Sequence, residues 1–166
     1  MTTDVLIILG SASDEKYLAK CIEVLKKMEI PFVVKVASAH RSPERLVAVL
    51  KEFEKSAQVV IAFAGHAAHL GGVIASKVIC PVIAVPLPTS DLLGIDALLS
   101  SVQMPGGVPV AVMAIGESGS FNAACFATQI LALKSPQLLA RWKAFKDGLE
   151  SKVTDSSTDV EQKWKL

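Results

Sequence analysis

The three histidines of this chain stand in two short segments of small residues, and one of them is next to an arginine. The first segment, residues 38–43, reads Ser-Ala-His-Arg-Ser-Pro and contains His40 and Arg41. An imidazole gains or loses a proton near neutral pH, and a guanidinium holds a phosphate through paired hydrogen bonds. The pair therefore predicts acid–base chemistry on a phosphorylated substrate. The competing interpretation is a solvated loop with two incidental polar side chains.

The second segment carries His66 and His69 among residues that have almost no side chains. Residues 64–72 read Ala-Gly-His-Ala-Ala-His-Leu-Gly-Gly, so a ligand can approach this backbone closely. Two histidines three positions apart could also bind a metal ion. No glutamate stands between them, however, and no thiolate or carboxylate cluster is near in the sequence. We therefore expect no metal here.

A third segment suited to binding is Gly-Ser-Ala-Ser-Asp, residues 10–14. Its small residues let backbone N–H groups approach an anion, and the Asp14 carboxylate can accept hydrogen bonds from ribose hydroxyls. It contains neither the dinucleotide motif G-x-G-x-x-G nor the Walker motif. Ser13 or Asp14 would equally cap a following helix, and for this segment taken alone capping is the favoured interpretation.

The sequence has no pattern typical of covalent catalysis. No Gly-x-Ser-x-Gly motif is present, and no lysine stands at the end of a predicted strand. Cys21, Cys80 and Cys125 lie in separate apolar segments without a C-x-x-C pair, which predicts buried thiols. Residues 100–110 are apolar and rich in proline and glycine, so we expect them to line the site or a subunit contact.

The elements that position these segments alternate between strands and helices. Short apolar stretches predict strands over residues 5–9, 32–36, 59–63, 82–85 and within 108–115. Helical spacing and helix-start signals predict helices over residues 15–29, 122–133 and 136–150. Another helix should begin at residue 43 with Ser42 as its cap, and a further helical segment should follow His69 and end near residue 77. This alternation is typical of right-handed βαβ units around a parallel sheet. We predict a three-layer α/β domain with an extra C-terminal helix.

In such a sheet the ligand lies beyond the carboxyl ends of the strands. The three segments above follow the first three predicted strands, so we expect them to meet at one edge. A chain of 166 residues suits one domain. We predict a catalytic domain of residues 1–150 and a polar tail of residues 151–166 that lies on the surface or on a neighbouring subunit.

Composition excludes several classes of protein. Hydrophobic residues make up 51% of the chain, which is too many for intrinsic disorder. A net charge of +1 with 5% aromatic residues argues against nucleic-acid binding. The apolar stretches are far shorter than the ~20 residues that a membrane span needs, and no basic segment precedes the first of them. We therefore expect no membrane association and a cytoplasmic location.

Five segments taken together resemble the aminoimidazole ribonucleotide carboxylases and N5-carboxyaminoimidazole ribonucleotide mutases of purine biosynthesis. They have the order and spacing of that family across most of the chain, at residues 10–14, 38–43, 67–70, 102–105 and 114–116. The resemblance implies a flavodoxin-like fold and a homo-octamer with sites where subunits meet. It also implies a nucleotide and carbon dioxide as the small-molecule reactants, with no cofactor.

The same resemblance implies roles for individual residues. The ribose phosphate should be held by Ser11, Ser13, Asp14 and Arg41. His40 should be the catalytic acid–base residue. The pocket for the base and carbon dioxide should be shaped by His69 with Gly65, Ala67 and Leu70. Neighbouring positions complete the predicted substrate-binding set: Gly10, Ser38, Ala39 and His66.

Two activities are open within the family. A direct carboxylase, a lyase, joins carbon dioxide to C4 of aminoimidazole ribonucleotide, and His40 would then take the C4 proton. A mutase, an isomerase, moves the carboxylate from N5 to C4. Mutases usually have Trp where this chain has Glu15, and Gly and then Pro where it has His66 and Gly71. We therefore favour the direct carboxylase, with the mutase as the alternative. A non-enzymatic nucleotide-binding module of flavodoxin-like fold is the rival from another class.

Overall fold

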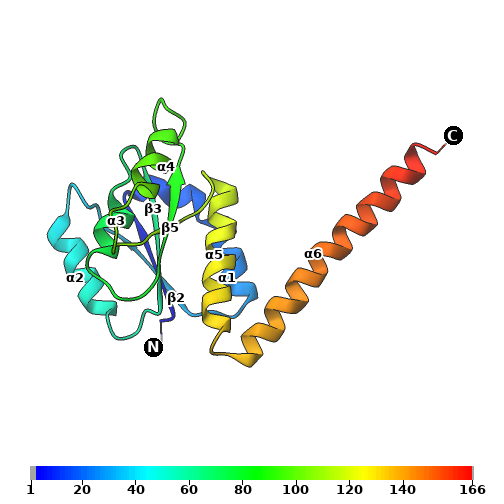
Figure 1. Ribbon diagram of the computed structural model, residues 1–166, viewed down its shortest axis with the longest axis horizontal. Helices are drawn as coiled ribbons and strands as arrows, with labels where there is room; N and C mark the ends of the chain where they lie inside the picture. Colours follow the sequence, from blue (N-terminus) through cyan, green and yellow to red (C-terminus); the bar gives the residue numbers. More distant parts are fainter. Residues whose placement is uncertain (1–2, 166) are drawn as a thin grey trace. The chain divides into compact units, whose positions relative to one another are not determined.

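Five parallel strands form one sheet in the order β2-β1-β3-β4-β5 (Figure 1). The computed structural model describes residues 3–165. The strands are β1 (Val5–Leu9), β2 (Phe32–Val36), β3 (Val59–Gly65), β4 (Val82–Leu87) and β5 (Ala111–Val112). Every residue of β1 is buried, as the continuous apolar stretch predicts for a central strand.

Helices cover both faces of this sheet. The helices of the described residues are the 3-10 helix η1 (Ala12–Tyr17), α1 (Ala19–Lys27), α2 (Pro43–Phe53), α3 (Leu70–Ala75), α4 (Ile95–Val102), α5 (Glu117–Ala132) and α6 (Pro136–Lys163). Figure 1 shows α1 and α5 on one face, and α2, α3 and α4 on the other. This is the three-layer, flavodoxin-like α/β fold that we expected. The chain divides into two compact units, one up to Ala127 and one from Thr128 onward.

The core on the α2 side shows how the layers are held. Leu6 and Ile8 of β1 belong to one buried cluster with Leu46 of α2 and Ile74 of α3. Side chains of a strand alternate between its two faces, so Ile7 points to the opposite layer. Each fully buried side chain of this size stabilises the fold by about 1.5–3 kcal/mol.

The first helix differs from the prediction over residues 15–29. It is divided into η1 and α1, with Leu18 between them. Ser11, and not Ser13 or Asp14, is the N-cap: its hydroxyl accepts a hydrogen bond from the Ser13 amide, and Asp14 accepts one from the Ser11 amide. This reciprocal capping box starts the helical backbone before the expected residue.

The region after β4 also differs. Helix α4 occupies residues 95–102, where we predicted no helix; it begins after Gly94, which takes the left-handed conformation with φ 89°. Strand β5 has only two residues of the stretch 108–115. Pro109 has no N–H to donate to a neighbouring strand, which shortens β5 at the sheet edge.

Helices α3 and α5 also have other bounds than predicted. Helix α3 ends at Ala75, just before the expected end near residue 77. Helix α5 begins at Glu117, earlier than the predicted 122.

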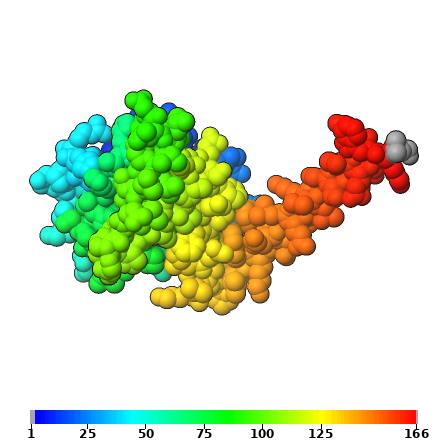
Figure 2. All heavy atoms as spheres, turned by 45° about the horizontal axis from the view of Figure 1, so that its top comes forward, coloured from blue at the N-terminus to red at the C-terminus, as the bar shows by residue number. Residues whose placement is uncertain are grey.

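The C-terminal helix α6 is longer than expected. Ser135 caps it by accepting a hydrogen bond from the Leu138 amide, and Pro136 stands at its first turn. The helix continues through residues 151–163, which we predicted as a tail, because no proline or glycine interrupts them. Residues 151–165 are exposed, as their polarity predicts, and they are orange to red in Figure 2. The division into a domain of residues 1–150 and a tail of 151–166 stays a prediction. No helix within residues 3–165 is both long and apolar enough to cross a membrane.

Candidate active site

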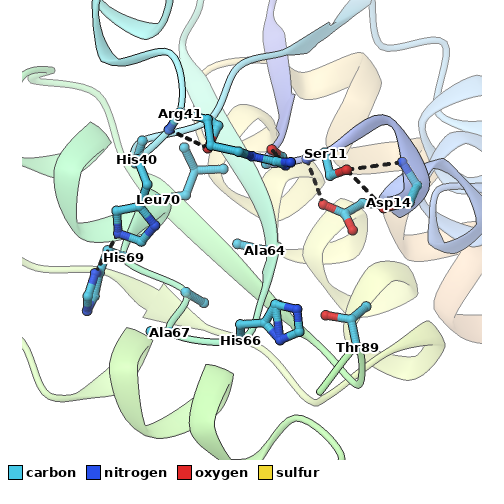
Figure 3. A pocket seen from close by; sticks show the side chains of 16 residues that line it. Ser11, Asp14, His40, Arg41, Ala64, His66, Ala67, His69, Leu70 and Thr89 are labelled. Atoms are coloured by element: carbon cyan, nitrogen blue, oxygen red, sulfur yellow. Dashed lines mark hydrogen bonds between the residues drawn. The ribbon is translucent and has the colours of Figure 1, made fainter. Parts of the chain in front are cut away.

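The loops at the carboxyl ends of β1, β2, β3 and β4 surround one cavity of about 490 Å³ (Figure 3). All thirteen predicted site residues line it: Gly10, Ser11, Ser13, Asp14, Ser38, Ala39, His40, Arg41, Gly65, His66, Ala67, His69 and Leu70. Three further lining residues were not predicted, namely Ala64, Ala68 and Thr89. The parallel sheet therefore brings the three segments together, as the strand order requires.

The loop after β1 is held by its own capping box. The Asp14 carboxylate is buried, and it accepts a hydrogen bond of 2.9 Å from the Ser11 amide. Burial raises the pKa of Asp14, while the Ser11 amide and the nearby charges of Arg41 and His66 oppose that rise. The Ser13 hydroxyl donates to the Ser11 hydroxyl over 2.9 Å. Both serine hydroxyls face the cavity, and the role of Asp14 toward ribose stays a prediction.

The loop after β2 is a tight turn that presents His40 and Arg41. The Ser38 amide donates to the Ser42 hydroxyl over 3.0 Å, and the Arg41 amide donates to the Ser38 hydroxyl over 3.1 Å. Ser42 is the N-cap residue of α2 and Pro43 stands in its first turn, as predicted, although the Ser42 side chain makes no capping hydrogen bond. The Arg41 guanidinium reaches the Gly10 carbonyl at 3.5 Å, next to the Ser11 hydroxyl.

Two imidazoles meet on one wall of the cavity. His40 Nε2 and His69 Nδ1 are 2.9 Å apart, and the rings are nearly perpendicular, with an interplanar angle of 89° (Figure 3). Both side chains are exposed. A hydrogen bond between two ring nitrogens requires that one of them carries the hydrogen and the other accepts it. The pair can therefore pass a proton to or from a group in the cavity.

His66 and the unpredicted Thr89 line another part of the cavity (Figure 3). A Cβ on Gly65 would lie 1.6 Å from Thr89 Oγ1. Glycine at position 65 therefore lets the Thr89 side chain, which follows β4, lie against the end of β3. Thr89 was not predicted because it follows the fourth strand, whereas the three predicted segments follow the first three. Its place just after the fourth apolar stretch was the signal that could have found it.

Other parts of the chain contribute less to the cavity than expected. No residue of the segment 100–110 lines the cavity within this chain, so the expectation that this segment lines the site or a subunit contact stays a prediction. Within the described residues no three His, Cys, Asp or Glu side chains are grouped to hold a metal ion.

Cys21 and Cys125 are buried as predicted, whereas Cys80 is partly exposed. Burial raises the pKa of Cys21 to about 12, which keeps its thiol protonated and inert.

Comparison with known proteins gives a family match along most of the chain. The family model described as AIR carboxylase matches residues 4–152. The chain is 46% identical over 157 residues to the N5-carboxyaminoimidazole ribonucleotide mutase of Saccharolobus solfataricus, which covers 94% of this chain and 98% of that protein. It is 45% identical over 157 residues to the protein of the same name from Pseudomonas aeruginosa, with 94% and 96% covered.

Solved structures agree with this match. The crystal structure of Treponema denticola PurE2-S38D superposes with a TM-score of 0.86 at 28% sequence identity, and all of both chains is covered. The crystal structure of Treponema denticola PurE gives a TM-score of 0.85, also at 28% identity, with 98% of each chain covered.

Proposed function

The chain belongs to the AIR carboxylase family, and on that basis we propose that it is an N5-carboxyaminoimidazole ribonucleotide mutase of purine biosynthesis. The relatives at 46% and 45% identity that carry this name support the mutase, which was our alternative, over the direct carboxylase that we favoured. The observation that carries the proposal is the hydrogen-bonded His40–His69 pair inside a cavity that also contains Arg41 and serine hydroxyls.

The departures that led us to favour the carboxylase lie mostly outside the cavity. Of Glu15, His66 and Gly71, only His66 lines it. Glu15 is exposed on η1, and a Cβ on Gly71 would point at the Ala84 side chain, 3.1 Å away. The prediction that all three changes surround the pocket is therefore wrong, and of the three only His66 lines the cavity that would have to be reshaped for a carboxylase.

The substrate's groups suit the two ends of the cavity. The phosphate would lie against Arg41 and the hydroxyls of Ser11 and Ser13, which supply a positive charge and hydrogen-bond donors. The ribose would extend past Asp14, and the aminoimidazole would reach the floor at Ala64. In this pose C4 and N5 face the His40–His69 pair.

The proposed reaction needs one proton to enter and one to leave. Breakage of the bond between N5 and the carboxylate carbon releases carbon dioxide, and N5 takes a proton. C4 then bonds to the same carbon dioxide, and the hydrogen on C4 must depart as a proton to restore aromaticity. One imidazole that donates a proton to N5 and then accepts the proton from C4 would account for both transfers. We assign this role to His40, which His69 contacts through a hydrogen bond. Confinement of carbon dioxide beside C4 removes the entropic part of the barrier.

The test compares two substrates with the purified protein. We expect turnover of the N5-carboxylated nucleotide in the absence of bicarbonate, and little turnover of aminoimidazole ribonucleotide with added bicarbonate. The reverse preference would restore the direct carboxylase. Binding of either nucleotide without turnover would favour the binding module.

A further inference from the structure

His66 has an unusual backbone for a residue with a side chain. Its φ is 52°, in the left-handed region that glycine adopts freely and that other residues rarely take. Residues held in that region cluster at functional sites, where the surrounding structure maintains them. His66 stands at the end of β3, and its exposed ring points into the cavity (Figure 3). This left-handed backbone therefore presents a third imidazole to the cavity, in addition to those of His40 and His69.

The surroundings of His66 favour a hydrogen-bond donor there. A positive charge on this ring would oppose the rise in the pKa of Asp14 and would add to the lowering of the pKa of Asp96. The Asp96 carboxylate is itself held by the Ser90 hydroxyl at 2.8 Å, which is the main cause of its lowered pKa. Among the described residues no group forms a hydrogen bond with the His66 ring or with the Thr89 hydroxyl. Both donors are therefore open to a ligand.

We propose that His66, together with the Thr89 hydroxyl, binds the carboxylate group of the nucleotide. This inference rests on the proposed function. The phosphate, the ribose and the reacting C4 already have partners in the proposed pose, and the carboxylate is the remaining anionic group. His66 is the remaining side chain of the cavity that can carry a positive charge, after His40, His69 and Arg41. A charged acceptor makes the stronger class of hydrogen bond with such donors.

The test measures equilibrium binding of two nucleotides by calorimetry, so that it does not depend on turnover. We expect His66→Gly to lower the affinity for 4-carboxy-5-aminoimidazole ribonucleotide by roughly tenfold or more, which is the loss typical of a hydrogen bond to a charged group. Binding of aminoimidazole ribonucleotide, which lacks the carboxylate, should change by no more than about twofold. Thr89→Val, which keeps the shape of the side chain and removes its hydroxyl, should show the same selectivity with a smaller loss.

Glycine at this position also separates binding from folding. Because glycine takes the left-handed conformation without strain, His66→Gly should melt at or above the temperature of the wild type. An equal loss of affinity for both nucleotides, or no loss for either, would overturn the inference while the proposed function stands. A wild-type protein that binds neither nucleotide would instead overturn the proposed function, and this inference with it.

Discussion

At the residue scale, the side chains of the cavity differ in whether they can exchange a proton near neutral pH. His40 and His69 lie 2.9 Å apart, and Arg41 stands next to His40 in the same turn. The guanidinium stays charged at all relevant pH values, so it binds and does not exchange protons. We therefore propose that the imidazole pair transfers the proton, and that the arginine and the serines bind the phosphate.

Replacement of His40 by asparagine tests this division of roles. Asparagine keeps a hydrogen-bonding side chain but cannot transfer a proton, so we expect His40→Asn to lower kcat by at least about 100-fold. Affinity for the nucleotide should stay nearly unchanged, since Arg41 and the serines remain. Steady-state kinetics and calorimetric titration measure the two effects. Full activity of this variant would remove His40 from its proposed role.

Asp14 leads to a pH dependence of stability. Burial raises its pKa above the ordinary 3.8, so the native chain binds a proton at a higher pH than the unfolded chain. The contribution of Asp14 to the free energy of unfolding is therefore greatest below pH 3.8 and falls as the pH rises through the raised pKa. Asparagine does not titrate, and its amide oxygen can still accept from the Ser11 amide.

We predict that Asp14→Asn becomes more stable relative to the wild type as the pH rises from about 4 to 7. Urea unfolding at several pH values measures this difference. Glu15→Gln, which removes a charge at the next, exposed position, is the matched control and should show a smaller trend. A difference between Asp14→Asn and the wild type that stays constant with pH would contradict the prediction.

Close backbone approaches at the element scale hold the loops in place. The Arg45 Nε group donates to the Val36 carbonyl over 2.8 Å and joins the start of α2 to the end of β2. The Ser120 hydroxyl donates to the Tyr17 carbonyl over 2.6 Å and fixes the start of α5 beside η1. Gly119 allows this arrangement, because a Cβ there would lie 1.7 Å from the Ala114 carbonyl oxygen.

Two helical glycines should therefore respond to alanine with opposite signs. At Gly119 the added Cβ would clash with the backbone of Ala114, which cannot move away as a flexible side chain could. Gly119→Ala should therefore lower the free energy of unfolding by roughly 1–3 kcal/mol or more. A Cβ on Gly148, within α6, meets nothing within 4 Å. Gly148→Ala should raise helix stability by about 0.5–1 kcal/mol. Denaturation followed by circular dichroism measures both, and equal effects would contradict the packing of Gly119.

At the scale of the whole molecule, exposed large apolar side chains are grouped in α4 and in the segment before it. Five large apolar side chains of this region are each about half exposed or more: Leu92, Leu93, Ile95, Leu99 and Val102. Neighbouring apolar side chains on one element typically mark a contact with another protein. This surface supports the homo-octamer that we expect from the resemblance, and it uses α4, a helix that the sequence did not predict.

Light scattering of the purified protein tests the assembly. We predict a mass of roughly eight times the 17.6 kDa of one chain, in a closed symmetric assembly. Replacement of Leu92 and Leu99 by lysine should reduce that mass, because charged side chains in an apolar contact oppose association. A monomeric wild type would contradict the prediction. The cytoplasmic location is a separate prediction that this measurement does not address.

Sequence alone was enough to predict the sheet, the main helices and thirteen of the sixteen residues around the cavity. The signals for strands and helices are local, and the carboxyl ends of parallel strands meet at one edge whatever the details of packing. The tertiary structure decided which side chains face one another. The His40–His69 bond joins residues 29 positions apart, Thr89 stands against Gly65 from a different strand, and only one of the three departures reaches the cavity. Those distances depend on strand order and register, which bring together residues that no local pattern relates.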